Sequence, residues 1–237
     1  MNRRWFAPLL AAAVLAGGCA GVAPDGAKAD DEMKQKERRS MTITPAEQNP
    51  EQFARRVAAQ GGRVDFVFED DRPFKECHAS TVAELPNGEL VCAWFGGTEE
   101  KDPDVGIWTS RLAEGVWTYP ERTVKVCEKA HWNPVLFRDV EGAVYLFFKV
   151  GVDVPQWQTY WMKTTDNART WSEPVELVPG DIGGRGPVKN KPIILSDGTW
   201  LAPASTELAK WKPSSDMYDV GWRPFVDRSE DRGATWK

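Results

Sequence analysis

The chain has 237 residues, of which 41% are hydrophobic and 27% charged, so its composition is that of a soluble globular protein with one large domain or two small ones. Its net charge is −5, and no basic cluster offsets this charge. The acidic balance argues against nucleic acid or an anionic membrane surface as the main binding partner.

The first 19 residues are typical of an export signal. A start with two arginines precedes an apolar run at residues 5–16, which is too short to span a membrane. Two glycines then precede Cys19, and small residues directly before a cysteine resemble a bacterial lipobox. The resemblance implies a lipoprotein-type signal at 1–19, a lipid on Cys19, a flexible tether at 20–43, and a periplasmic or cell-surface location. Cleavage at another small residue, followed by free secretion, is the alternative.

Residues 44–62 are expected to form a short helical appendage. Thr44 and Pro45 suit a helix N-cap followed by a proline in the first turn. Gly61 and Gly62 would end this amphipathic helix after Ala59.

From residue 63 to residue 237 the pattern is all-β. Short runs of β-branched and aromatic residues alternate with Gly, Pro, Asn and Asp turns, and no helical period is sustained. Turn glycines recur at Gly88, Gly142 and Gly198, with spacings of 54 and 56 residues. Strands are expected on both sides of each glycine, at 79–85 and 90–95, at 134–137 and 143–150, and at 192–195 and 199–204. Third strands are expected at 108–112 and 159–164.

A repeat of this length with two hairpin signals predicts one four-stranded propeller blade per repeat. The blades would lie near residues 63–125, 126–180 and 181–237, so the domain at 63–237 would be a partial β-propeller. Three blades cannot close a ring without exposed strand edges. The sequence is therefore expected to be a fragment of a longer chain.

A second motif, S/T-x-D-x-G-x-T-W, occurs at 229–236 and at 164–171, where Ala168 replaces the glycine. It suits a β-hairpin turn, because the aspartate can accept hydrogen bonds across the bend, the glycine can adopt positive φ, and the tryptophan is an apolar anchor. This motif is similar to the Asp-box, the signature of sialidase-type β-propellers. A structural role is therefore expected for Asp166, Trp171, Asp231, Gly233 and Trp236.

Longer segments carry a more specific resemblance. C-H-A-S-T at 77–81, D-V-G-I-W at 104–108, W-N-P-V-L-F at 132–137 and K-N-K-P-I at 189–193 resemble the bacterial sialidase-like family with BNR or Asp-box repeats. The resemblance implies a six-bladed β-propeller, of which this chain holds about three blades, and a glycoside hydrolase acting on terminal acidic sugars of glycans. In the wider superfamily a Tyr/Glu pair is the nucleophile, an Asp is the acid/base, and an arginine triad binds the sugar carboxylate. No cofactor is implied, and the sequence has no metal-ligand cluster.

The resemblance also points to catalytic residues. The family places its acid/base aspartate between the second and third strands of the first blade, which makes Asp104 the first candidate; a solvated acidic loop is the alternative. Where sialidases carry Arg-Ile-Pro, eight residues before the turn, this chain has His78. Arginine is a permanent carboxylate ligand, whereas histidine binds anions only when protonated and can instead act as a base. A hydrolase or lyase for other uronic-acid glycans that uses His78 is thus a second hypothesis.

Side chains at the starts of the innermost strands should converge on the central channel of a propeller, where amides and ammonium groups suit a sugar. The candidate substrate-binding residues are His78, Asn133, Lys149, Asn190, Lys191 and Glu207, with Lys149 and Glu207 placed at the ends of second strands. The glycine-rich loop at 179–189 is expected to be a mobile lip over the channel. The same groups would suit a non-catalytic propeller that binds glycans, and ordinary surface positions are the remaining alternative.

Three cysteines follow the signal, Cys77, Cys92 and Cys127, and their odd number excludes a complete set of internal disulfides. Cys77 and Cys92 could pair in an oxidising compartment, and buried free thiols are the alternative.

Overall fold

The computed structural model describes residues 49–212 and 217–237, of which residues 207–212, 217–220 and 222 are described by their backbone alone. The expected signal, the tether and the lipidation site at Cys19 lie outside these residues. The chain divides into two compact units, Met1–Asp65 and Phe66–Lys237. In the described part of the chain, no helix is long and apolar enough to cross a membrane.

The first unit contains helix α2 (Pro50–Ala59). Asn49 is its N-cap, and the side-chain oxygen of Asn49 accepts a hydrogen bond from the backbone nitrogen of Glu51 at 2.9 Å. The helix ends where the sequence predicts, just before Gly61, whose φ of 79° suits a residue without a side chain. The expected N-cap, Thr44, lies outside the described residues.

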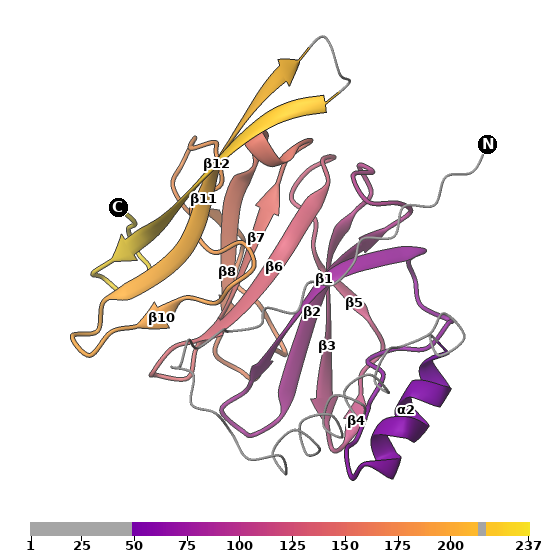
Figure 1. Cartoon of the computed structure of the whole chain (residues 1–237). Coiled ribbons are helices and arrows are strands. Elements are labelled where there is room, and N and C mark those ends of the chain that lie inside the picture. Colours follow the sequence, from indigo (N-terminus) through magenta and orange to yellow (C-terminus); the bar gives the residue numbers. More distant parts are fainter. Residues whose placement is uncertain (1–48, 213–216) are drawn as a thin grey trace, which may run out of the picture. The chain divides into compact units, whose positions relative to one another are not determined.

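The second unit consists of three antiparallel sheets whose neighbouring strands are joined by hairpins (Figure 1). The first sheet contains β1 (Glu76–Glu84), β2 (Leu90–Gly97), β3 (Gly106–Ala113), β4 (Val116–Trp117) and β5 (Glu121–Val124). The second contains β6 (His131–Arg138), β7 (Val144–Val150), β8 (Gln158–Thr164) and β9 (Val175–Glu176), with the 3-10 turn η2 (Val154–Gln156) before β8. The third contains β10 (Ile193–Ile194), β11 (Trp200–Lys212) and β12 (Met217–Ser229). The same hairpin plan is thus repeated three times along the chain.

The repeat extends to details of the backbone. The turn glycines Gly88, Gly142 and Gly198 have φ values of 83°, 93° and 86°, a conformation that residues with side chains rarely adopt. Each of the first two sheets also has a β-bulge in its first strand, at Ala79 in β1 (φ 55°) and at Asn133 in β6 (φ 39°). These two residues are 54 positions apart, which is the spacing of the first two turn glycines. The first and second sheets are therefore equivalent units.

Successive sheets of the second unit pack face to face. In β7, Leu146 and Phe148 belong to the core shared with the first sheet, whereas Tyr145 and Phe147 belong to the core shared with the third sheet. A strand buried on both faces has a continuous apolar sequence, as V-Y-L-F-F-K-V does at 144–150. This stacking of sheets is the packing of consecutive blades in a β-propeller.

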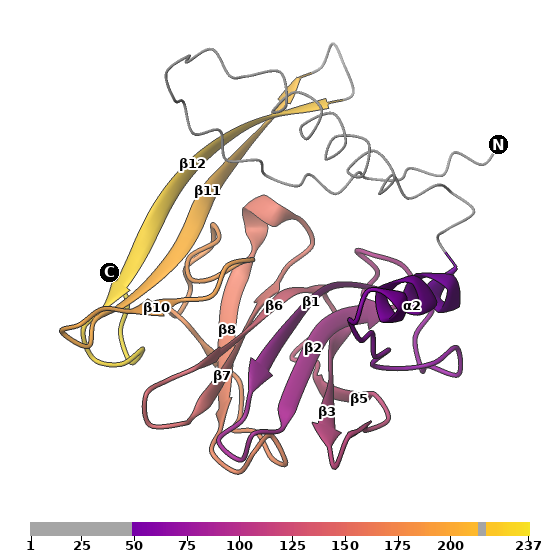
Figure 2. The ribbon, with the colours of Figure 1, turned by 60° about the horizontal axis from the view of Figure 1, so that its bottom comes forward.

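The first strands of the sheets converge. Strands β1 and β6 lie side by side in both views (Figure 1, Figure 2), and the backbone nitrogen of Leu136 donates to Thr81 Oγ1 at 3.3 Å. The ammonium of Lys191, directly before β10, donates to the carbonyl oxygens of Val82 and Leu136, both at 2.6 Å. Convergence is expected of the innermost strands of a propeller.

The hairpin of β11 and β12 is longer than the sequence predicts. A strand is expected at 199–204, but pairing runs from Trp200 opposite Ser229 to Lys212 opposite Met217. Glu207 therefore lies within the strand, opposite Trp222, and not at its end. Residues 205–212 have no regular alternation of apolar and polar residues, so pairing with the second half of the hairpin determines their conformation.

Of the two alternatives for Cys77 and Cys92, a disulfide or free thiols, the structure has free thiols. All three cysteines in the described residues are free, with Cys92 buried and the other two exposed. Cys77 lies opposite Gly96, four residues along β2 from Cys92. This offset separates the two cysteines by about 13 Å, whereas a disulfide needs Cα atoms within about 7 Å. Burial raises the pKa of the Cys92 thiol to about 11, so only this cysteine behaves as the expected buried thiol.

Candidate functional site

The two Asp-box turns are closed by the same hydrogen bonds. Asp231 Oδ1 accepts from Ser229 Oγ and from the backbone nitrogen of Thr235, both at 2.8 Å, and Asp231 Oδ2 accepts from Thr235 Oγ1. Asp166 accepts the equivalent bonds from residues 164 and 170 at 2.6–2.9 Å. These bonds, led by the threonine hydroxyl, lower the pKa of Asp231 to about 2 and hold the pKa of Asp166 well below its usual range. Both carboxylates thus hold turns together.

The other Asp-box residues pack against the cores. Gly233 has a φ of 86°, and a Cβ at this position would lie 2.8 Å from the ring of Trp200. In the first copy of the motif, Ala168 adopts a φ of 56° and is buried in the core between the first and second sheets. Trp236 is buried beside Trp200, and Trp171 is partly buried against the same core as Ala168. All five expected Asp-box residues therefore make turn or core contacts.

Acid should weaken the fold through Asp231. Because its pKa is about 2 in the folded protein and close to 3.8 when unfolded, its contribution to stability is present above pH 3.8 and is lost as the pH falls towards 2. We expect the melting temperature to fall less steeply over this pH range in Asp231→Asn than in the wild type. Thermal denaturation between pH 2 and pH 6, followed by circular dichroism, measures both slopes. Asp153→Asn is the control, because the side chain of Asp153 makes no capping hydrogen bond in η2. Equal slopes in wild type and Asp231→Asn would contradict the role of Asp231.

His131, the other histidine of the chain, is a structural residue. Its side chain is fully buried in β6, where Nε2 accepts from the backbone nitrogen of Val126 at 2.9 Å and Nδ1 lies 2.9 Å from the carbonyl oxygen of Lys129. The ring stacks on Phe148, and burial lowers the pKa of His131 to about 4. The imidazole is therefore neutral at physiological pH, with its proton on Nδ1.

His78, by contrast, is exposed at the start of β1. Its Nδ1 lies 3.8 Å from Glu100 Oε2, and 72% of its side chain is accessible to solvent. The ring meets Phe95 edge to face at a centroid distance of 5.6 Å. His78 and Glu100 thus form a solvent-accessible pair. In the described residues, no hydrogen bond or ion pair joins His78 to Asn133 or Asn190.

Asp104 lies in the loop between β2 and β3, near the end of that loop. Its Oδ2 accepts hydrogen bonds from the backbone nitrogen of Thr98 at 3.0 Å and from Thr98 Oγ1 at 2.9 Å, which ties the two ends of the loop together. The ammonium of Lys125 donates to the carbonyl oxygen of Pro103 and fixes the loop from a second side. Burial lowers the pKa of Lys125. The loop that carries Asp104 therefore has a defined conformation.

A pocket of about 590 Å³ opens beside Asp104, and we call it the basic pocket. Its lining includes Arg72, Phe74, Lys75, Asp104, Trp108 and Arg122. The first three belong to the segment before β1, and the last belongs to β5. No sequence signal indicates its three cationic residues, because none of them lies in a repeat or motif that would point to a shared site.

Two lysines expected at the rim have other roles. Lys149 is fully buried, and its ammonium donates to Thr159 Oγ1 at 2.7 Å and to the carbonyl oxygens of residues 184–186. Lys149 therefore lies beneath the glycine-rich loop and does not face a ligand. Lys191 binds carbonyl groups of β1 and β6, and burial lowers the pKa of Lys191. Asn133 is partly buried at its bulge, Asn190 is exposed before β10, and the side chain of Glu207 lies outside the described residues.

The loop at 179–189, expected to be a mobile lip, is held by charged groups. Asp227 of β12 is 2% exposed, and its Oδ1 accepts from Arg185 Nε at 2.9 Å. Asp227 Oδ2 accepts from the backbone nitrogen of Gly186 at 2.6 Å. Gly183 donates its backbone N–H to the carbonyl oxygen of Trp157 at 3.1 Å. Together with Lys149, these contacts fix the loop between the second and third sheets.

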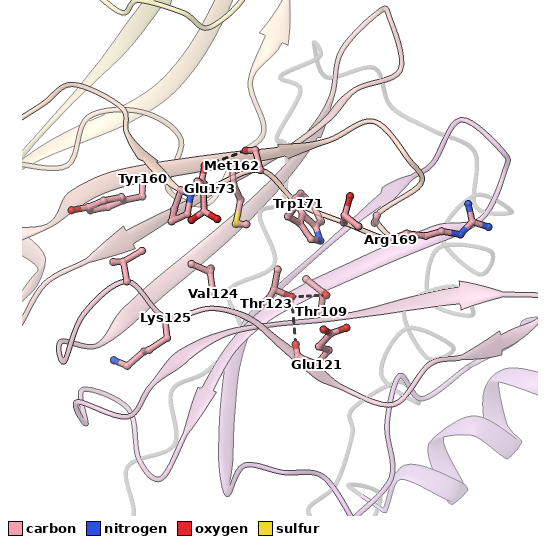
Figure 3. A pocket seen from close by; sticks show the side chains of 15 residues that line it. Thr109, Glu121, Thr123, Val124, Lys125, Tyr160, Met162, Arg169, Trp171 and Glu173 are labelled. Atoms are coloured by element: carbon pink, nitrogen blue, oxygen red, sulfur yellow. Dashed lines mark hydrogen bonds between the residues drawn. The ribbon is translucent and has the colours of Figure 1, made fainter.

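A groove of about 680 Å³ lies between the first and second sheets (Figure 3), and we call it the intersheet groove. Its lining includes Glu121, Lys125, Tyr160, Arg169, Trp171 and Glu173. Tyr160 donates its hydroxyl hydrogen to Glu176 Oε1 at 3.1 Å. Burial, with a smaller contribution from Glu176, raises the pKa of Tyr160, which opposes its use as a phenolate nucleophile.

Across residues 49–212 and 217–237, no group of three or more His, Cys, Asp or Glu side chains could hold a metal ion.

Comparisons with solved structures agree with the fold. A Hadza microbial sialidase has a TM-score of 0.51 and 16% identity, over 68% of this chain and 36% of its own. A protein of unknown function from Dyadobacter fermentans has a TM-score of 0.54 and 17% identity, over 70% of this chain and 55% of its own. The GH93 α-L-arabinofuranosidase of Fusarium graminearum has a TM-score of 0.49 and 15% identity, over 73% of this chain and 51% of its own. The chain thus spans between about a third and somewhat more than half of the length of these proteins.

The first two likenesses show that the second unit has a β-propeller fold. No curated protein matches the chain. Residues 88–237, which are more than half of the sequence, match the family model of the BNR repeat-like domain. That match covers both Asp-box turns and most of the three sheets, and the chain therefore belongs to the family of BNR repeat-like domains.

Proposed function

We propose that the protein is an exported, sialidase-like glycoside hydrolase acting on terminal acidic sugars of glycans, with the six-bladed propeller that the family resemblance implies. The observation that carries this proposal is the loop between β2 and β3, which presents Glu100 beside the accessible His78 and Asp104 beside a pocket. Export and a lipid on Cys19 rest on the signal-like N-terminal sequence.

In the proposed reaction, Asp104 is the general acid that protonates the leaving oxygen of the glycosidic bond. Thr98 would orient the carboxyl group, because the Thr98 backbone nitrogen and hydroxyl both lie within 3.0 Å of Asp104 Oδ2. His78, which is accessible beside Glu100, would donate a hydrogen bond to a sugar carboxylate. We assign the nucleophile to no residue of this chain.

Asp104→Asn should bind substrate and lose turnover by about a hundredfold, because amides cannot donate the proton that general acid catalysis requires. Release of a terminal sialic or uronic acid from a glycan by the intact protein measures turnover, and calorimetry measures binding. Asp102→Asn, in the same loop, is the matched control and should keep full activity. Unchanged turnover in Asp104→Asn would remove this assignment, and full activity in His78→Ala would remove the hypothesis of a uronic-acid hydrolase or lyase that uses His78.

A non-catalytic glycan-binding propeller is the second candidate. One observation favours it, because both oxygens of Asp104 already accept hydrogen bonds within the loop. A carboxyl group held in this way by its own loop suits hydrogen bonding to sugar hydroxyls. Glycan binding by the wild type without any released sugar would support this candidate over the hydrolase.

A further inference from the structure

The basic pocket has a fixed aromatic floor. Trp108 donates its Nε1 hydrogen to the carbonyl oxygen of Gly96 at 2.9 Å, which sets the position of the indole ring. The buried ring of Phe74 packs against Trp108 at a centroid distance of 5.1 Å and an angle of 58°. Trp108 itself remains partly exposed, so the floor offers an apolar surface to a ligand.

The pocket concentrates positive charge in a chain whose net charge is −5. Three cationic side chains line it, Arg72, Lys75 and Arg122, against one carboxylate, Asp104. The intersheet groove (Figure 3) is of similar size but is lined by two acidic and two basic side chains, Glu121, Lys125, Arg169 and Glu173. The charge of the basic pocket is therefore a local feature, and it favours an anionic ligand.

The cationic groups are available to a ligand. In the described part of the chain, the Lys75 ammonium and the Arg122 guanidinium have no hydrogen-bond or ion-pair partner. Arg72 is oriented by Asp70 at 3.1 Å, and its second terminal nitrogen lies 3.4 Å from the carbonyl oxygen of Lys75. Arg122 lies opposite Trp108 in the pairing of β3 with β5, so its guanidinium group borders the aromatic floor.

The aliphatic part of the Arg122 side chain lies against the backbone of Gly106. A Cβ at Gly106 would lie 3.1 Å from Arg122 Cδ, so the glycine leaves the space in which the arginine side chain lies along the strand. Restricting the aliphatic part of an arginine reduces the entropy lost when its guanidinium group binds an anion.

We propose that the basic pocket binds the oxyanion of an acidic saccharide, a carboxylate or a sulfate. Arg122 and Lys75 contact the oxyanion, the sugar ring lies on Trp108, and Asp104 accepts a hydrogen bond from a sugar hydroxyl. Arg122 can bind the oxyanion through two parallel hydrogen bonds, which an ammonium group cannot do. The inference rests on the glycan ligand of the proposed function and not on its cleavage.

Isothermal titration calorimetry of the intact protein with glucuronic acid, glucose 6-sulfate and glucose tests this site. A charged sugar should bind at least about tenfold more tightly than glucose, since hydrogen bonds to charged groups are stronger than neutral ones. The two charged sugars separate a carboxylate site from a sulfate site. Arg122→Ala and Lys75→Ala should each weaken binding of the charged sugar by about tenfold or more, and Arg122→Lys should lose part of that affinity.

Arg169→Ala, which removes one positive charge from the intersheet groove, is the matched control and should bind as the wild type does. No preference over glucose, or an equal loss in Arg169→Ala and Arg122→Ala, would overturn the inference. The hydrolase and the anion site can be contradicted separately. Binding of an acidic sugar without cleavage would contradict the proposed hydrolase and support the anion site. Cleavage of a glycan without any preference for the charged sugars would support the hydrolase and contradict the anion site.

Discussion

Replacing Trp200 with alanine is expected to lower the free energy of unfolding by about 3–5 kcal/mol, the usual cost of truncating a buried aromatic side chain. Trp200 is 2% exposed and belongs to the core between the second and third sheets. Its ring lies 4.9 Å from that of Phe137 and 5.1 Å from that of Tyr145, both in nearly perpendicular arrangements. Gly233, which also lies against the ring of Trp200, has no side chain to fill the cavity that alanine would leave.

Urea denaturation of the wild type and the variant measures this loss. Trp200→Phe, which keeps an aromatic ring, should cost less than Trp200→Ala. Val226→Ala is the surface control on the same sheet; Val226 is 55% exposed, so its truncation should change the free energy of unfolding by less than about 0.5 kcal/mol. A Trp200→Ala loss no larger than that of Val226→Ala would mean that the second and third sheets do not pack as described.

The parts of the fold that depend on local chemistry could be predicted from the sequence. Gly88, Gly142 and Gly198 mark turns because positive φ is a property of the single residue. The hydrogen bonds of Asp231 span only four residues, so the motif itself contains every partner that the turn needs. The period of these signals then indicates three blades without any knowledge of long-range contacts.

Contacts between distant segments could not be predicted in this way. Lys149 has the sequence position of a rim residue, yet its ammonium binds carbonyl groups 35–37 residues further along the chain. Burying an ammonium group requires such partners, and which loop supplies them is decided by tertiary packing. The long hairpin of β11 and β12 was missed for the same reason, since its pairing and not its apolar pattern maintains the strands.

The candidate site contains residues that a local motif indicates and residues that only tertiary packing brings together. His78 and Asp104 are found by their position within family-like motifs, because the first blade carries both. The basic pocket joins residues 72–75 to residue 122, and no motif spans that distance. Packing of Phe74 on Trp108 brings these segments together, so an apolar contact determines where the positive charges meet.

Asp227→Ala should lower the free energy of unfolding by about 3 kcal/mol and release the loop at 179–189. The Asp227 carboxylate is 3% exposed and accepts from both Arg185 and the backbone nitrogen of Gly186, so its removal leaves a guanidinium group and an N–H unpaired. Breaking a buried ion pair costs about 3–5 kcal/mol, and the lower value applies because 25% of the Arg185 side chain reaches solvent. Lys149 and Thr159, which donate hydrogen bonds to the carbonyl oxygens of residues 184–186, would then hold this segment.

Urea denaturation measures the energy, and limited trypsin digestion reports on the loop through cleavage after Arg185, which requires local opening. Asp181→Ala is the matched control, because Asp181 lies 3.5 Å from Arg185 but is 34% exposed, and such pairs contribute less than about 1 kcal/mol. We expect rapid cleavage in Asp227→Ala and slow cleavage in the wild type and Asp181→Ala. Equally rapid cleavage in all three would mean that Asp227 does not hold the loop, and that the loop is the mobile lip which its glycines alone predict.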